Sequence, residues 1–126
     1  MLELEMAAWD SLAAELGPAF DIERFVDTLG RLVRRLTGEG RVVTQARLAV
    51  FVEAGVNAAL QQRINEAQQR LLAWGEPVAA ALGLRERRSL LTLLAVVEGL
   101  MVNQVANPDP EFDPESAIAA VLRGLA

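Results

Sequence analysis

The side chains that could do chemistry in this chain are almost all carboxylates and guanidinium groups. The 12 basic residues are all Arg, 17 residues are acidic, and the chain contains no Lys, His, Cys or Tyr. This composition excludes thiol nucleophiles, imidazole bases, Schiff-base lysines, disulfides and the usual zinc ligand sets. Carboxylates alone could hydrolyse glycosides or hold a hard cation, but most lie where helix capping or solvation explains them. We therefore expect no enzymatic activity, no metal and no cofactor.

Four polar residues lie inside apolar runs, namely Gln45, Arg47, Glu98 and Asn103. Each is either a satisfied polar group of the core or an interface, or a contact to a bound ligand. A buried Glu98 needs a cation beside it, and Arg47 is the candidate partner.

The charge distribution argues against direct contact with nucleic acid or lipid. The net charge is −5, and the basic residues are spread along the chain instead of forming a stripe. The apolar run Ser89–Ala106 is nearly long enough to span a bilayer, but Glu98 at its centre is costly in lipid. The first residues are acidic where a signal peptide would be basic. We expect a soluble, cytoplasmic protein.

Helical periodicity accounts for almost the whole chain, which predicts an all-α single domain of about six helices over residues 1–126. Asp21, Asn57 and the pair Asp113-Pro114 are start signals. Gly75 and Pro77 predict a kink or short break near Trp74. The expected helices are Leu2–Leu16, Ile22–Thr37, Arg41–Ala54, a long helix from the cap Asn57 to Leu82, Arg85–Ala106 and Pro114–Leu125. The first begins without a cap, as expected for a helix within which the chain has been cut.

The helix Arg85–Ala106 is apolar on nearly all sides. A helix without a solvated face must be covered on both sides, and a chain of 126 residues has few other elements for that purpose. A second copy of the chain is the simplest cover, so we expect a homodimer.

The order and spacing of these segments resemble the C-terminal regulatory domain of the TetR family of transcriptional repressors. The matching segments are Ala46–Gly55, Ala59–Leu71, Leu90–Asp109 and the short helix after Asp113-Pro114. The resemblance implies an effector-sensing and dimerising half of a repressor, without the helix-turn-helix domain that binds DNA. We therefore expect no direct DNA binding by this chain.

The resemblance also implies a dimer in which the last two helices of each subunit form a four-helix bundle. Alternatively, the residues predicted for this interface belong to the core of a single chain. The expected interface residues are Leu93, Val97, Leu100, Met101, Gln104, Ile118, Val121 and Leu122.

In that family the effector pocket lies among the middle helices. We expect a cavity at the Gly75–Pro77 interruption, walled by Trp74 and Phe51, flanked by Phe25 and Trp9, and able to take a small apolar or aromatic molecule. The expected ligand contacts are Trp9, Phe25, Gln45, Phe51, Trp74 and Asn103. Ordinary core packing explains the aromatic residues equally well. An internal cavity of about 300 Å³ or more favours sensing, and a filled interior favours a dimeric adaptor module without a pocket.

Overall fold

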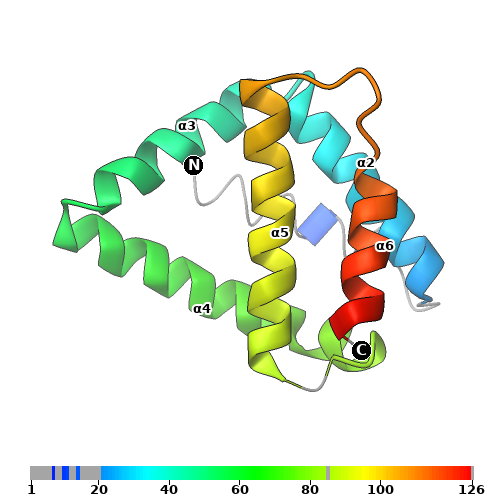
Figure 1. Cartoon of the computed structure of the whole chain (residues 1–126). Helices are drawn as coiled ribbons and strands as arrows, with labels where there is room; N and C mark the ends of the chain where they lie inside the picture. Colours follow the sequence, from blue (N-terminus) through cyan, green and yellow to red (C-terminus); the bar gives the residue numbers. More distant parts are fainter. Residues whose placement is uncertain (1–6, 8–9, 12–13, 15–20, 85, 126) are drawn as a thin grey trace.

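A computed structural model describes residues 7, 10, 11, 14, 21–84 and 86–125 of the chain. Within these residues all regular structure is helical, which confirms the predicted all-α class (Figure 1). The helices are α2 (Ile22–Thr37), α3 (Arg41–Ala54), α4 (Ala58–Ala81), α5 (Arg87–Ala106) and α6 (Pro114–Leu125). Their bounds agree closely with the predicted ones, whereas the predicted helix Leu2–Leu16 lies largely outside the described residues.

The predicted caps start three of the helices. The Asp21 carboxylate accepts a hydrogen bond of 2.7 Å from the backbone N–H of Arg24, and the Asn57 side chain accepts one of 3.1 Å from that of Leu60. At α6 the Asp113 carboxylate accepts one of 3.1 Å from the backbone N–H of Ser116. Each bond satisfies an N–H group that has no partner within its helix, which is why the chain turns helical there.

Helix α4 continues through Pro77 without the break that the sequence predicted as one possibility. Packing on both sides of the proline offsets the backbone hydrogen bond that it removes, because Leu71, Leu72 and Ala79 are all buried. The end of α4 lies instead at Leu82 and Gly83, where Gly83 adopts a φ of 81°. That left-handed conformation favours glycine, so the chain turns toward α5 at this position.

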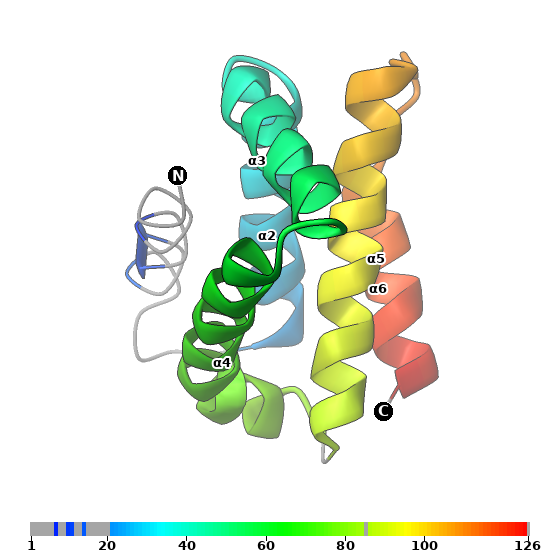
Figure 2. The same ribbon diagram turned by 90° about the vertical axis from the view of Figure 1, so that its left-hand side faces the viewer.

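The core lies between α2, α5, α6 and the last turns of α4. Helix α5 is central and contacts α2, α3, α4 and α6, while α6 packs on α2 and α5. Figure 2 shows α5 and α6 side by side along one side of the molecule. The core side chains are Phe25, Val26, Leu29, Leu32, Val33, Leu72, Ala79, Leu82, Leu84, Leu90, Leu93, Val97, Met101, Ile118 and Leu122.

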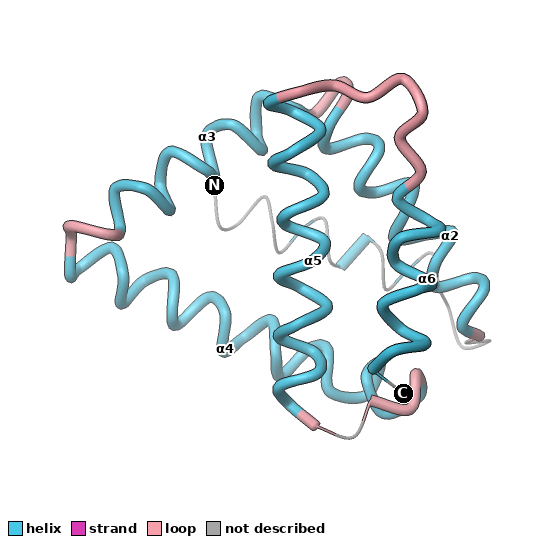
Figure 3. Tube along the Cα trace, in the orientation of Figure 1, coloured by secondary structure: helices cyan, strands magenta, loops and turns pink. Residues whose placement is uncertain are grey.

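Helix α3 and the first half of α4 form a hairpin that projects from this core. They diverge from the short turn at residues 55–57, and α5 crosses their far ends, so the three helices outline a triangle (Figures 1 and 3). Two valines near the turn, Val52 and Val56, are 77% and 86% exposed. The hairpin is therefore less covered than the helices of the core.

Candidate functional site

The two sides of α5 have different surroundings. Leu90, Leu93, Val97 and Met101 recur every three or four residues and are buried in the core of one subunit. The other side is only partly covered, and Thr92, Ala95 and Asn103 are exposed. The chain thus buries one side of α5 and covers the other only partly.

The structure corrects most of the predicted dimer face. Five of its eight residues, Leu93, Val97, Met101, Ile118 and Leu122, are buried inside a single subunit. A sixth, Gln104, exchanges two hydrogen bonds with the backbone of Asp109, at 3.0 and 3.2 Å, and so fixes the loop between α5 and α6. Only Leu100 and Val121 remain as half-buried apolar candidates. An apolar stripe in a sequence does not distinguish a surface covered by the same chain from one covered by a partner.

Helical spacing places another set of residues, which shares only Val121 with the predicted one, on the outer side of the paired helices α5 and α6. All are exposed or half-buried, none is charged, and most are small. An added Cβ at Gly99 or Gly124 would meet no heavy atom within 4 Å, so this surface is open. We call it the α5–α6 face: Thr92, Ala95, Val96, Gly99, Asn103, Ala117, Ala120, Val121 and Gly124.

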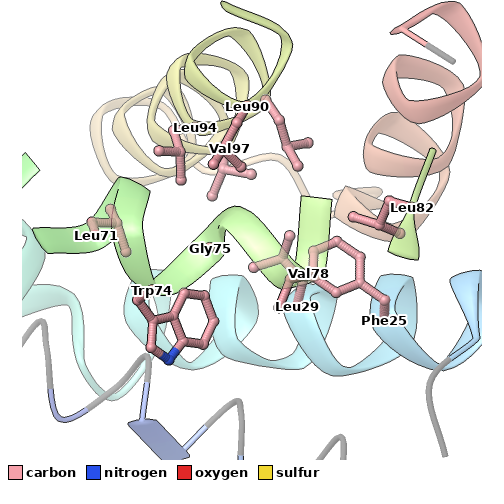
Figure 4. Close-up of a pocket in the computed structure, with 11 residues that line it drawn as sticks. Phe25, Leu29, Leu71, Trp74, Gly75, Val78, Leu82, Leu90, Leu94 and Val97 are labelled. Carbon is pink, nitrogen blue, oxygen red and sulfur yellow. The ribbon is translucent and has the colours of Figure 1, made fainter. Parts of the chain in front are cut away.

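Between α2, α4 and α5 lies a small apolar cavity (Figure 4). Its volume is about 20 Å³, which is room for roughly one water molecule. This cavity is therefore nearly filled and does not reach the 300 Å³ that would favour a preformed pocket. The lining residues are Phe25, Leu29, Leu71, Trp74, Gly75, Val78, Leu82, Leu90, Leu93, Leu94 and Val97.

Gly75 brings α4 close to α5 at this cavity. A Cβ at position 75 would lie 3.2 Å from Cδ2 of Leu90, which is tighter than ordinary van der Waals contact. The sequence interpretation assigned Gly75 to a gap between helices. In the structure it has the opposite effect, because the missing side chain lets Leu90 fill the space.

A second, larger hollow lies near the turn of the hairpin. This cleft is open to solvent, has a volume of about 330 Å³, and is walled by the end of α3 and the first three turns of α4. We call it the hairpin cleft. Its lining residues are Phe51, Ala54, Gly55, Gln61, Ile64, Asn65 and Gln68.

The predicted ligand contacts are thus divided among several places. Phe25 and Trp74 line the apolar cavity, but Phe51 lines the hairpin cleft and not the same wall as Trp74. Gln45 is exposed on α3, and the side-chain nitrogen of Asn103 donates to the Gly99 carbonyl oxygen of its own helix at 2.8 Å. The predicted contact at Trp9 lies outside the described residues.

The predicted pairing of Arg47 with Glu98 is confirmed. The Arg47 guanidinium donates to the Glu98 carboxylate, and the two side chains are 18% and 32% exposed. The guanidinium carbon of Arg47 also lies 4.4 Å from the centroid of the Phe51 ring, a cation–π contact. This group connects α3 to the central helix α5.

A second ion pair was not predicted from the sequence. Arg34 of α2 donates two hydrogen bonds to the Glu115 carboxylate of α6, at 2.8 and 2.9 Å. These bonds hold the pKa of Glu115 below its usual value, and likewise raise the pKa of Arg34. Gly30 provides the space, because a Cβ there would lie 2.5 to 2.7 Å from the Glu115 side chain. In the sequence, Gly30 lies inside a strongly helical pattern, and such a glycine indicates that another part of the chain approaches the helix closely.

By length and composition alone α5 could cross a membrane, with a mean hydropathy of 1.6. In this fold it contacts four other helices, and 11% of the apolar window is buried. Among the described residues, no cluster of three or more carboxylate, His or Cys side chains could hold a metal ion.

Comparison with known families identifies the domain. The family model for the tetracyclin repressor-like C-terminal domain matches residues 20–126 and so includes all five described helices. No curated protein and no solved structure matches the chain. The match covers the hairpin, the central α5 and the α5–α6 pair, the same segments on which the sequence resemblance depends. The chain therefore belongs to the TetR-like C-terminal domain family, which comprises regulatory and not enzymatic domains.

Proposed function

We propose that this chain is the effector-sensing and dimerisation domain of a TetR-like transcriptional regulator, soluble and cytoplasmic. The observation that carries the proposal is the uncharged, uncovered α5–α6 face on a domain of this family. The net charge of −5 argues against phosphate contacts by this chain, so DNA binding belongs to another domain. The purified chain should leave a duplex DNA probe unretarded, and salt-sensitive retardation would overturn that part of the proposal.

In the proposed dimer, α5 and α6 of two copies pair as a four-helix bundle through the α5–α6 face. Small side chains such as Ala95, Gly99 and Ala120 let helices approach closely and pack backbone against backbone. A two-fold axis brings the same patch of each subunit together, so one substitution acts twice in the interface.

Sedimentation velocity at low micromolar concentration tests this interface. The wild-type chain should sediment as a dimer, and Gly99→Arg should give a folded monomer because two buried guanidinium groups would meet without a partner. Ala49→Arg is the matched control, since Ala49 is exposed on α3 and outside the face. A wild-type monomer, or a Gly99→Arg dimer, would contradict the proposed interface. Val97→Arg is uninformative, because Val97 belongs to the core of one subunit.

For the effector we propose a small, mostly apolar molecule at the cavity between α4 and α5. The apolar lining and the ring of Trp74 support this chemistry. A volume of about 20 Å³ admits no organic molecule, so binding requires the second half of α4 to move away from α5.

Melting temperatures measured with toluene, naphthalene and indole test this site. A compound that binds the folded state raises the melting temperature, and Trp74→Ala should abolish the rise while Phe51→Ala retains it. Fluorescence in a Trp9→Phe variant isolates Trp74, which should respond saturably to the same compounds.

A second candidate is a dimeric adaptor module without a ligand pocket. The nearly filled cavity between α4 and α5 favours it specifically, because this cavity holds no more than about one water molecule. A dimer that none of the apolar probes stabilises would establish the adaptor over the sensor.

A further inference from the structure

We propose that the hairpin cleft is a second binding site, for a small, flat, uncharged molecule that carries amide-type hydrogen-bonding groups. The site goes beyond the proposed function, because its lining shares no residue with that of the apolar cavity between α4 and α5. The cleft is open to solvent, and its volume of about 330 Å³ is room for a small ring compound.

The wall from α4 defines the polar chemistry of the site. Gln61, Asn65 and Gln68 follow one another at four and three residues, which puts the three amides in one row along the helix. Each amide offers two N–H donors and a carbonyl acceptor. Among the described residues, no side-chain hydrogen bond engages any of the three. The row can therefore pair with a ligand that has donors and acceptors of its own.

The wall from α3 defines the shape of the ligand. Phe51 is half-buried and lines the cleft, and the Arg47 guanidinium lies over its ring at 4.4 Å from the centroid. Rings pack against such a side chain by stacking or by edge contact, which favours a flat molecule. Ala54 and Ile64 add apolar surface, so the ligand combines a flat apolar body with polar groups directed toward α4.

The electrostatics of the cleft favour a neutral ligand. None of its lining residues is charged, and Arg47, beside Phe51, is already paired with Glu98. An anion would find no unpaired cation among the lining residues and would have to displace Glu98 from Arg47. A cation would find no carboxylate in the lining.

Nuclear magnetic resonance of the full chain with three probes of the same ring size tests this proposal. Benzamide carries the ring and the amide, toluene carries the ring alone, and benzoate replaces the amide with a charge. Benzamide should shift the side-chain NH₂ resonances of Gln61, Asn65 and Gln68 saturably, and more strongly than the other two probes. Equal shifts with toluene or benzoate would overturn the assigned chemistry.

Variants locate the binding. Asn65→Leu should weaken benzamide binding about fivefold, the value of one hydrogen bond. Gln62→Leu removes a neighbouring exposed amide that does not line the cleft, and should leave binding within about twofold. Phe51→Leu, which keeps the apolar volume without the ring, should also weaken it. Unchanged binding in both Asn65→Leu and Phe51→Leu would refute the site, whereas the dimer mass and the response of Trp74 report separately on the proposed function.

Discussion

The body formed by α2, α5 and α6 and the hairpin formed by α3 and the first half of α4 are built very differently. Seven of the 16 residues of α2 are buried, whereas from residue 41 to residue 70 only Thr44 and Ala54 are. Because buried apolar area provides most of the stabilising free energy of a fold, stability is concentrated in the body. The hairpin can change position at a much lower cost.

The attachments between helices show the same contrast. Within the body, Arg34 and Glu115 join α2 to α6 through two hydrogen bonds on top of an apolar core. The hairpin is attached at its base by the Thr44 hydroxyl, which donates to the Leu36 carbonyl oxygen at 2.6 Å, and further along by the Arg47–Glu98 pair. This division suits the proposed regulator, because the hairpin is continuous with the second half of α4 and can shift with it on ligand binding, while the body holds the proposed dimer together.

Truncation of a buried side chain should reveal the largest difference in unfolding free energy between the body and the hairpin. Ile118 of α6 is fully buried, so Ile118→Ala should cost about 2–5 kcal/mol of unfolding free energy. Ile64 in the hairpin is only half-buried, and Ile64→Ala should cost about 1 kcal/mol or less. Urea unfolding at one fixed protein concentration measures both, because dimer stability depends on concentration. Equal losses of unfolding free energy in the two variants would contradict the proposed difference between the body and the hairpin.

A glycine substitution tests the close approach of α2 and α6. Gly30→Ala should destabilise the protein by about 1–3 kcal/mol, because the new Cβ would overlap the Glu115 side chain and displace it from Arg34. In a Glu115→Ala background the overlapping atoms are gone, so the same substitution should be nearly neutral. A double-mutant cycle by chemical unfolding gives the coupling, and additive effects would show that Glu115 does not fill that space.

Removal of the Arg47–Glu98 pair should loosen the hairpin without unfolding the body. We expect Arg47→Met to cost about 1 kcal/mol, in the range for a partly exposed pair, and to speed amide hydrogen exchange in α3. Arg63→Met on the exposed side of α4 is the matched control and should change neither quantity. Faster exchange in α2 and α6 as well would mean that the hairpin is part of the body.

Acid should weaken the Arg34–Glu115 connection. The hydrogen bonds from Arg34 lower the pKa of Glu115 from its usual 4.5 in the folded state, so its contribution is full above that value and is lost as the pH falls through the lowered pKa. The pKa of the neighbouring Asp113 is also lowered, chiefly by the hydrogen bond from the Ser116 hydroxyl. Unfolding between pH 6 and pH 3 should therefore depend less on pH in Glu115→Gln, and an identical pH profile would exclude Glu115 as a source of acid sensitivity.

Local signals in the sequence predicted the secondary structure well. Asp21, Asn57 and Asp113 cap helices through bonds between residues three apart, so the sequence alone contains both partners. The Arg47–Glu98 pair was also predictable, because a carboxylate within an apolar run requires a cation.

Contacts between residues far apart in the sequence were much harder to predict. Residues Arg34 and Glu115 are 81 positions apart, and neither interrupts an apolar run. Phe51 lies near the hairpin turn and Trp74 lies well along α4, so their shared periodicity did not place them on one wall. Helix α5 is apolar on two sides, and the sequence does not indicate which side its own chain covers. The predicted interface therefore fell mostly on the side that is buried within the chain.

Peptide-resolved hydrogen exchange of the wild-type chain, at a concentration where it is fully dimeric, tests the central claim most directly. We expect slow exchange throughout α2, α5 and α6, including the residues of the α5–α6 face, and much faster exchange over residues 41–70. Dilution to the monomer or the Gly99→Arg substitution should speed exchange in α5 and α6 and leave the hairpin unchanged. A hairpin as protected as the body, or an α5–α6 face whose exchange does not respond to dissociation, would contradict the account.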